Sequence, residues 1–326
     1  MKLREDLWEA KERAPTRQGF GEGLVEAGEA DEHIVALSAD LTESTKMDLF
    51  EKKFPERFIQ VGVAEQNLVT LASGMANYGK IPFVTSYAAF SPGRNWEQIR
   101  TTIALNDVPV KIVGSHAGLL TGPDGATHQM LEDLALMRAM PNVIVLSPCD
   151  AEEARKATLA AAKTGTPVYI RVEREKMPRM TTAETPFTLG KANLMWDADT
   201  PQVAIFATGS LLHNALKAAK ELENDIAVTV TNIHTIKPID EEAIVREAAR
   251  AGVVVSVEEH QINGGLGGAI AEVLAREQPT PMEFVGMHDK FGQSGEAKEL
   301  IDHYGMGVKD IVASVKRVKE RANKPE

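Results

Sequence analysis

The sequence is poor in cysteine, in net positive charge and in long apolar segments. Cys149 is the single cysteine in 326 residues, which excludes an intrachain disulfide and a cysteine-rich zinc site. The net charge of -11 argues against a surface that binds nucleic acid or an anionic membrane. No apolar run approaches the roughly 18 residues of a membrane-spanning helix, and the charged residues 1–6 contain no signal-peptide core. We therefore expect a soluble, cytoplasmic protein.

Short apolar strands alternate with helical patterns along most of the chain. Alternation of this kind predicts mostly parallel sheets with helices on both faces, so the fold class is α/β, with two doubly wound domains. Residues 177 to about 201 lack periodicity and contain several prolines. We interpret residues 1–180 as the first domain, 181–201 as a linker and 202–326 as a second, smaller domain. The first domain's strands are expected at residues 33–38, 58–61, 81–87, 109–113, 142–146 and 167–172.

Glu65 lies where the strand at 58–61 turns into a helix predicted over residues 66–78. Open α/β sheets bind ligands just outside the carboxyl ends of their strands, which is where this turn is expected. An isolated glutamate at such a place is most often a helix N-terminal acid, favoured by the helix dipole. The residues that follow the other strands favour a functional role instead.

Polar and aromatic residues follow at least five strands of the first domain. If the sheet is parallel, these turns open on one edge, and the side chains share one site. His116, Asp124 and His128 do not match a zinc-ligand spacing, so no metal ligand is predicted in this chain. Arg171, at a strand end, is the natural anchor for an anion, the alternative being a surface salt bridge. The candidates are Asp40, Ser44, Glu65, Tyr87, Phe90, His116, Asp124, His128 and Arg171.

The second domain has a glycine-rich turn, residues 263–268, directly after Glu258, Glu259 and His260. A turn of this kind can hold a phosphate at a helix N-terminus. It lacks the full dinucleotide fingerprint, so tight packing between strand and helix is the favoured interpretation.

Several of these motifs together resemble one known family. Residues 16–178 resemble the pyrimidine-binding domain of thiamine-diphosphate enzymes of the transketolase family, and the remainder resembles that family's C-terminal domain. The order of the motifs along the chain matches as well. The matching segments are Thr16-Arg17, Ser38-Ala39-Asp40-Leu41-Thr42 with Ser44, Gly62-Val63-Ala64-Glu65-Gln66, Asp124-Gly125-Ala126-Thr127-His128-Gln129 and Tyr169-Ile170-Arg171.

The resemblance assigns a role to each candidate. It implies that Glu65 hydrogen-bonds N1′ of the cofactor's aminopyrimidine and so activates C2 of the thiazolium, which attacks a ketose. Such a glutamate must share a proton with the ring. Residues 91–95 do not align with full-length transketolases, so a third stacking aromatic cannot be placed. The resemblance further implies cofactor contacts by Phe90, Tyr87 and Asp40, substrate and proton-transfer roles for His116 and His128, a sugar-hydroxyl contact by Asp124, and phosphate anchors at Arg17, Ser44 and Arg171.

One family motif is missing. Transketolases bind the diphosphate and Mg²⁺ through a Gly-Asp-Gly motif followed by Asn in a separate N-terminal domain, and this sequence contains no such pattern. The resemblance therefore implies the C-terminal half of a split transketolase, assembled as α2β2. A partner subunit would hold Mg²⁺ or Ca²⁺ and the phosphates of thiamine diphosphate, and this chain would supply Glu65 across the interface.

Three alternatives stay open. A 1-deoxyxylulose-5-phosphate synthase-like enzyme shares the Asp-Gly-x-Thr-His pattern but resembles this chain less at His116. The β-subunit of a 2-oxoacid dehydrogenase also places a glutamate after the corresponding strand, although the loop bearing Asp124 and His128 favours sugar chemistry. A degenerate partner that keeps only the fold is the non-enzyme alternative. Pentose phosphates are the default substrates, and the sequence does not specify the sugar.

Overall fold

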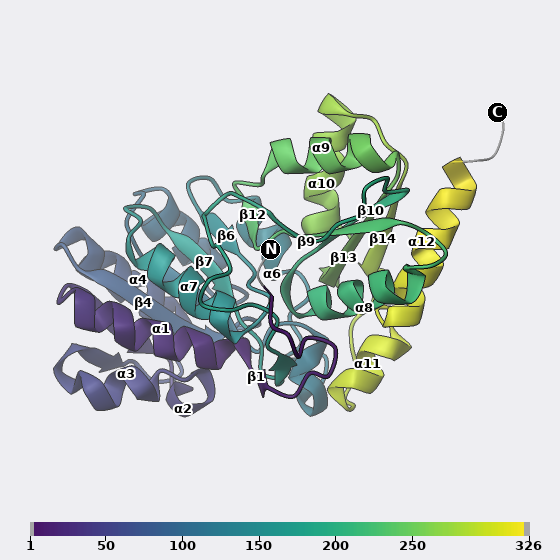
Figure 1. The fold of residues 1–326 in the computed structure, drawn as a ribbon. Helices are drawn as coiled ribbons and strands as arrows, with labels where there is room; N and C mark the ends of the chain where they lie inside the picture. Colours follow the sequence, from purple (N-terminus) through teal and green to yellow (C-terminus); the bar gives the residue numbers. More distant parts are fainter. Residues whose placement is uncertain (1–2, 323–326) are drawn as a thin grey trace.

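Two sheets, each covered by helices, form the two lobes of the molecule (Figure 1). The structure is a computed structural model and describes residues 3–322. The first lobe contains the N-terminal half of the chain, and the second lobe contains the green to yellow C-terminal half. The predicted α/β class with two mostly parallel sheets is confirmed.

The first sheet has seven strands in the order β12-β6-β7-β5-β4-β2-β3. Six of them are parallel: β2 (Ile34–Ser38), β3 (Phe58–Gln60), β4 (Ile81–Tyr87), β5 (Lys111–Ser115), β6 (Ile144–Leu146) and β7 (Val168–Arg171). The seventh, β12 (Thr235–Lys237), is antiparallel and comes from the second half of the chain. It was not predicted from the sequence.

Helices cover both faces of this sheet because its strands are apolar on both faces. In β4, Phe83 packs into a core with Phe20 and Leu24, whereas the next residue, Val84, packs into a different core with Leu68. Successive side chains of a strand point to opposite faces, which explains the two cores. The helical elements are α1 (Thr16–Ala30), α2 (Thr42–Thr45), α3 (Asp48–Lys53), η1 (Pro55–Arg57), α4 (Glu65–Asn77), α5 (Trp96–Gln98), η2 (Ile99–Ala104), η3 (Leu119–Asp124), α6 (Asp133–Arg138) and α7 (Ala151–Ala162).

The second sheet has the order β14-β13-β10-β11-β9, and only its edge strand β9 is antiparallel. Its strands are β9 (Asn193–Trp196), β10 (Val203–Ala207), β11 (Val228–Asn232), β13 (Val254–Gln261) and β14 (Met282–Met287). The accompanying helices are η4 (Gly209–Leu211), α8 (Leu212–Leu222), α9 (Glu241–Ala251), α10 (Leu266–Glu277), α11 (Ala297–His303) and α12 (Val308–Ala322).

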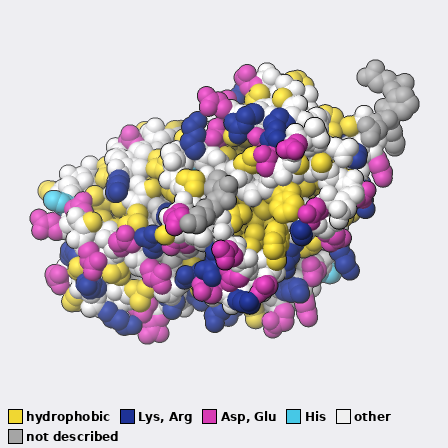
Figure 2. Space-filling model, in the orientation of Figure 1, with side chains coloured by type: hydrophobic (Ala, Val, Ile, Leu, Met, Phe, Trp, Pro, Cys, Tyr) yellow, Lys and Arg dark blue, Asp and Glu magenta, His cyan; other side chains and the backbone are white. Residues whose placement is uncertain are grey.

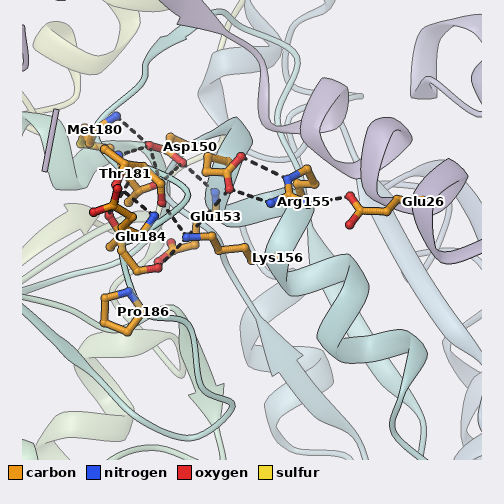
Figure 3. Close-up of polar contacts among 12 residues, drawn as sticks. Glu26, Asp150, Glu153, Arg155, Lys156, Met180, Thr181, Glu184 and Pro186 are labelled. Atoms are coloured by element: carbon orange, nitrogen blue, oxygen red, sulfur yellow. Dashed lines mark hydrogen bonds and ion pairs between the residues drawn. The ribbon is translucent and has the colours of Figure 1, made fainter. Parts of the chain in front are cut away.

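The segment expected to be a linker is held to the first domain (Figure 3). Asp150 caps α7 and also accepts hydrogen bonds from the backbone N–H groups of Met180 and Thr181, at 2.7 and 2.6 Å. Lys156 donates to the carbonyls of Thr182 and Thr185. Farther along, β9 lies inside residues 181–201 and pairs with β11. Residues 181–201 therefore do not form a free linker: their first part is hydrogen-bonded to the first domain, and their last part belongs to the second sheet.

The parallel strands of the first sheet end at a common edge, as the sequence predicted. Ser38 of β2 is level with Gln60 of β3 and Thr85 of β4, and Tyr87 is level with Ser115 of β5. The loops after these strands therefore start side by side, and this edge positions the candidate site.

Two properties of the surface bear on its partners. Acidic and basic side chains are interspersed over the face drawn in Figure 2, without a large field of one sign. Over residues 3–322, no helix is both long enough and apolar enough to cross a membrane.

Candidate active site

Glu65 is the first residue of α4, directly after the turn that follows β3. Its side chain is only 2% exposed. Asn95 fixes the backbone of this turn, since its side-chain amide donates to the Glu65 carbonyl at 2.8 Å. Burial of a carboxylate is costly unless partners compensate it, so the groups around Glu65 determine what it can do.

Arg94 is the charged partner of Glu65. Its Nη1 lies 2.8 Å from Oε2 of Glu65, while the Ser86 hydroxyl is 3.4 Å from Oε1. The guanidinium also lies over the Phe90 ring, 4.9 Å from the centroid. The Arg94 side chain is 49% exposed, so it approaches the buried carboxylate from the open side. Sequence reasoning did not select Arg94; it lies in the segment that departs from full-length transketolases.

The predicted aromatic residues and histidines form one cluster. Tyr87 stacks on His116 with centroids 3.8 Å apart, and it lies roughly parallel to Phe90 at 6.2 Å. His128 meets the edges of both aromatic rings, at 6.1 Å from Tyr87 and 5.4 Å from Phe90. Side chains from the end of β4 and from the segments after β4 and β5 are thereby brought together, which the sequence alone could only infer from the expected strand ends.

His116 is held as a neutral imidazole. Arg17 donates from Nη1 to Nε2 of His116 at 3.2 Å, which makes Nε2 the acceptor because arginine has no acceptor. The remaining proton is therefore on Nδ1, which lies 2.9 Å from the Ser115 hydroxyl. Burial, followed by the charges of Arg17 and Arg174, lowers the pKa of His116 to about 3. His116 thus acts as a neutral hydrogen-bonding group at ordinary pH.

Arg17 and Arg174 form a cationic pair at this edge. The Arg17 side chain donates to the Ser44 carbonyl, and its Nε is buried without a hydrogen-bond partner within residues 3–322. Burial and the charge of Arg174 lower the pKa of Arg17. An anionic oxygen would satisfy the unpaired donor and relieve the repulsion between the two cations. Arg174 carries no signal in the sequence, since it lies three residues beyond Arg171, the last residue of the strand.

Arg171 does not lie at this site. Its side chain is 3% exposed, and it donates to Asp133 at 3.1 Å and to the Glu259 carbonyl at 2.7 Å. Burial by itself lowers the pKa of Arg171, but the negative charges of Asp133, Glu259 and Glu173 outweigh it and raise the pKa. The predicted phosphate anchor is therefore corrected: Arg171 is an ion-paired residue between the domains. Arg174, three residues later, donates to the Thr121 carbonyl at 2.9 Å, and its charge acts on Arg17 and His116.

The two remaining acidic candidates lie on the periphery. Asp40 is exposed in the left-handed region, at φ 67°, and its N–H donates to the Gln60 side chain. Asp124 is exposed at the end of η3, in the loop that leads to His128. Within residues 3–322, no group of three or more His, Cys, Asp or Glu residues is arranged to hold a metal ion.

The glycine-rich turn of the second domain is a packing element. Glu258 accepts hydrogen bonds from the N–H groups of Leu266 and Gly267, at 2.7 and 2.8 Å. Because a buried carboxylate of the same chain already caps α10, these donors are not free for a phosphate. This agrees with the interpretation favoured from the sequence.

Comparison with known proteins decides the family. Residues 12–180 match the family described as "Transketolase, pyrimidine binding domain", and residues 190–311 match "Transketolase, C-terminal domain". The chain belongs to the transketolase family. A putative transketolase C-terminal section from Methanocaldococcus jannaschii is 43% identical over 94% of this chain and 96% of that protein.

Other relatives of this transketolase-family chain are named as subunits of split enzymes. The 6-deoxy-6-sulfo-D-fructose transketolase subunit SqwH of Clostridium sp. (strain MSTE9) is 39% identical over 94% of this chain and 95% of that protein. A solved split gene transketolase, described as an inactive beta4 tetramer, superimposes with a TM-score of 0.88 at 43% identity, covering 94% of this chain and 98% of that one. The chain thus corresponds, over nearly its whole length, to a transketolase C-terminal section.

Proposed function

We propose that this chain is the C-terminal subunit of a split transketolase, which transfers a two-carbon ketol unit from a ketose phosphate to an aldose phosphate. The observation that carries the proposal is the cluster of buried Glu65, Tyr87, Phe90 and two histidines at one sheet edge. A carboxylate beside flat aromatic faces fits an aminopyrimidine.

The residues of this edge divide between cofactor and substrate. When bound, thiamine diphosphate supplies the nucleophilic carbon that carries the two-carbon unit. Glu65 holds or releases a proton at the aminopyrimidine nitrogen N1′, Phe90 and Tyr87 pack against the ring, and Asp40 lies toward the cofactor. His128 and Asp124 contact sugar hydroxyls, with His128 able to move a proton. His116, whose Nε2 already accepts from Arg17, lies beside them as a neutral group.

We assign binding of the sugar's anionic group to Arg17 and Arg174, beside Ser44. Support comes from the unpaired Nε of Arg17 and from the repulsion between the two guanidinium groups. A planar fork of donors suits a phosphate or a sulfonate. The name of the Clostridium relative raises the sulfonate alternative, so both classes of donor sugar are to be assayed.

An N-terminal partner subunit completes the site by holding the diphosphate and Mg²⁺. The missing Gly-Asp-Gly motif supports this assignment, as does the description of a relative's β4 tetramer as inactive. The exposed face of α4 fits a partner: Leu71 and Tyr78, two turns apart, are 38% and 92% exposed. Gly74 lies between them, where an added Cβ would meet nothing of this chain. Because α4 begins at Glu65, a subunit docked here would close the cofactor site.

The test is ketol transfer from xylulose 5-phosphate to ribose 5-phosphate with thiamine diphosphate and Mg²⁺. The chain is assayed alone and mixed with a candidate N-terminal subunit, and pyruvate decarboxylation is measured in parallel. We expect transfer only in the mixture. Transfer by the chain alone, or tight cofactor binding by it, would contradict a split site; pyruvate decarboxylation would favour the synthase or dehydrogenase alternatives.

A further inference from the structure

The second domain holds the loop that carries Asp124 and His128. At the start of this loop, residues 118–130, the N–H of Leu120 donates to Oε1 of Glu259 at 2.7 Å. At its end, the Gln129 amide donates to the carbonyl of Gln293 at 2.9 Å. Both acceptors belong to the second domain, so the loop is fixed at two points by a domain that supplies none of the predicted site residues.

Glu259 is built into the contact. It lies near the end of β13 and is 4% exposed, and its backbone carbonyl accepts from Arg171. The loop passes so close to its carboxylate that a Cβ at Gly118 would lie 2.4 Å from Oε1. Gly118 also has φ 74°, so both the space and the backbone conformation require glycine there.

The surroundings of Glu259 carry several charges. Glu173 of the first domain is also buried, and each of the two carboxyls has one oxygen, Oε2, without a hydrogen-bond partner within residues 3–322. Arg171, Asp133 and Glu173 are the charged groups that face Glu259. Burial and the neighbouring Glu173 raise the pKa of Glu259. Glu173 in turn connects to the site, since its N–H donates to the hydroxyl of Thr16, beside Arg17.

We propose that Glu259 is a positioning residue for the substrate: through the Leu120 N–H it fixes the loop at 118–130, and the second domain thereby places Asp124 and His128. The inference rests on the proposed function for its kinetic consequence but not for the loop contact itself. Loss of the contact moves the substrate groups and leaves Glu65, on α4, in place. Substrate affinity therefore falls, whereas cofactor affinity does not.

The variants are Glu259→Leu, Glu259→Gln and, as a matched control, Glu258→Gln. Glu258 is equally buried on the same strand but caps α10 within the second domain. In the assembled enzyme, we expect Glu259→Leu to raise the KM for xylulose 5-phosphate up to about tenfold, as for loss of one hydrogen bond, with cofactor Kd unchanged. Glu259→Gln keeps an acceptor oxygen and restores most of this loss, and Glu258→Gln leaves KM unchanged.

Hydrogen–deuterium exchange of the free chain provides a readout without activity. Glu259→Leu should speed exchange across residues 118–130, and Glu258→Gln should speed it only at the start of α10. Equal changes in KM for the two positions, or an unchanged loop in Glu259→Leu, would overturn the proposal. A wild-type enzyme without ketol transfer would instead refute the proposed function, and the exchange experiment would still decide the loop contact.

Discussion

Charged residues and histidines follow strands in both sheets, but they are exposed to different degrees in the two domains. In the first domain, the residues beyond the strands include half-exposed or exposed side chains such as Arg94, Asp124 and His128. In the second domain, Glu258, Glu259 and His260 at the end of β13 are all buried. They contact the N-terminus of α10, Leu120 and the N–H of Ala135, respectively.

The comparison teaches that polar residues at a strand end do not by themselves mark a ligand site. In the second domain, hydrogen bonds within the chain satisfy nearly all of these groups, and their effect is on packing and position. In the first domain, Glu65 is buried but is reached from the open side by Arg94, and the partly buried Arg17 keeps an unpaired donor, Nε. Access from the open side, rather than the residue type, separates the edge of the first sheet from that of the second.

The largest expected effect is on proton exchange at the edge of the first sheet, where Glu65 lies. Glu65→Gln removes the group that exchanges a proton with the cofactor, so hydrogen–deuterium exchange at C2 of bound thiamine diphosphate should slow by about 10²-fold or more in the assembled enzyme. Size-exclusion chromatography should show that the variant still assembles with the N-terminal subunit, because the amide keeps the shape of the side chain. Wild-type exchange rates in this variant would remove Glu65 from its role.

The two arginines after β7 test the comparison directly. Arg171→Met leaves Asp133 and Glu259 without their cation, and unfolding in urea should show a loss of about 3 kcal/mol or more. Arg174→Met removes one hydrogen bond to the Thr121 carbonyl, so it should cost only about 1 kcal/mol of stability. It should raise the KM for the sugar phosphate about tenfold or more, because one charged contact to the anion is lost. The reverse pattern would mean that the assignment of the two side chains is wrong.

Gly74 tests whether the exposed face of α4 is a partner surface. Gly74→Ala should stabilise the free chain by up to about 1 kcal/mol, since glycine is unfavourable within a helix. Gly74→Trp should prevent assembly with the N-terminal subunit, as measured by analytical ultracentrifugation. Gly165→Trp is the control, because its Cβ would likewise meet nothing of this chain and it lies in the loop between α7 and β7. Assembly of the Gly74→Trp chain would place the interface elsewhere.

The smallest expected effect is on the pH dependence of stability and concerns Glu153. Its carboxylate accepts a hydrogen bond from the side-chain amide of Asn232, in the second domain, at 2.8 Å. Burial, followed by the charge of Asp150, raises the pKa of Glu153 to about 7 from 4.5. The folded state then binds a proton that the unfolded state releases between these values, so this group's contribution to stability is lost as pH rises from 4.5 to 7. In Glu153→Gln, the free energy of unfolding measured in urea should depend less on pH between pH 5 and 8 than in the wild type. Glu152→Gln, whose carboxylate faces Arg155, should keep the wild-type slope there.

The sequence was sufficient for elements with a strong local signal. The helix predicted over residues 66–78 is α4, and its neighbouring strand places Glu65 at the turn between them. By contrast, the helical segment after Asn95 is divided into α5 and the π-helical η2, and local periodicity does not register such a change in hydrogen-bond pattern. Within residues 3–15 the chain forms turns and the short strand β1 (Arg13–Ala14), whose pairing with the distant β8 (Met177–Pro178) has no local signal.

By itself, the sequence determined the α/β class, the common edge of the first sheet and most residues gathered there, because alternation of apolar segments with turns is a local property. Only the tertiary structure decided that β12 crosses to the first sheet, that Arg171 pairs with Asp133 while Arg174 donates to the Thr121 carbonyl, and that Arg94 pairs with Glu65. Each of these depends on contacts between residues distant in sequence or on the direction of one long side chain, and no local pattern encodes either.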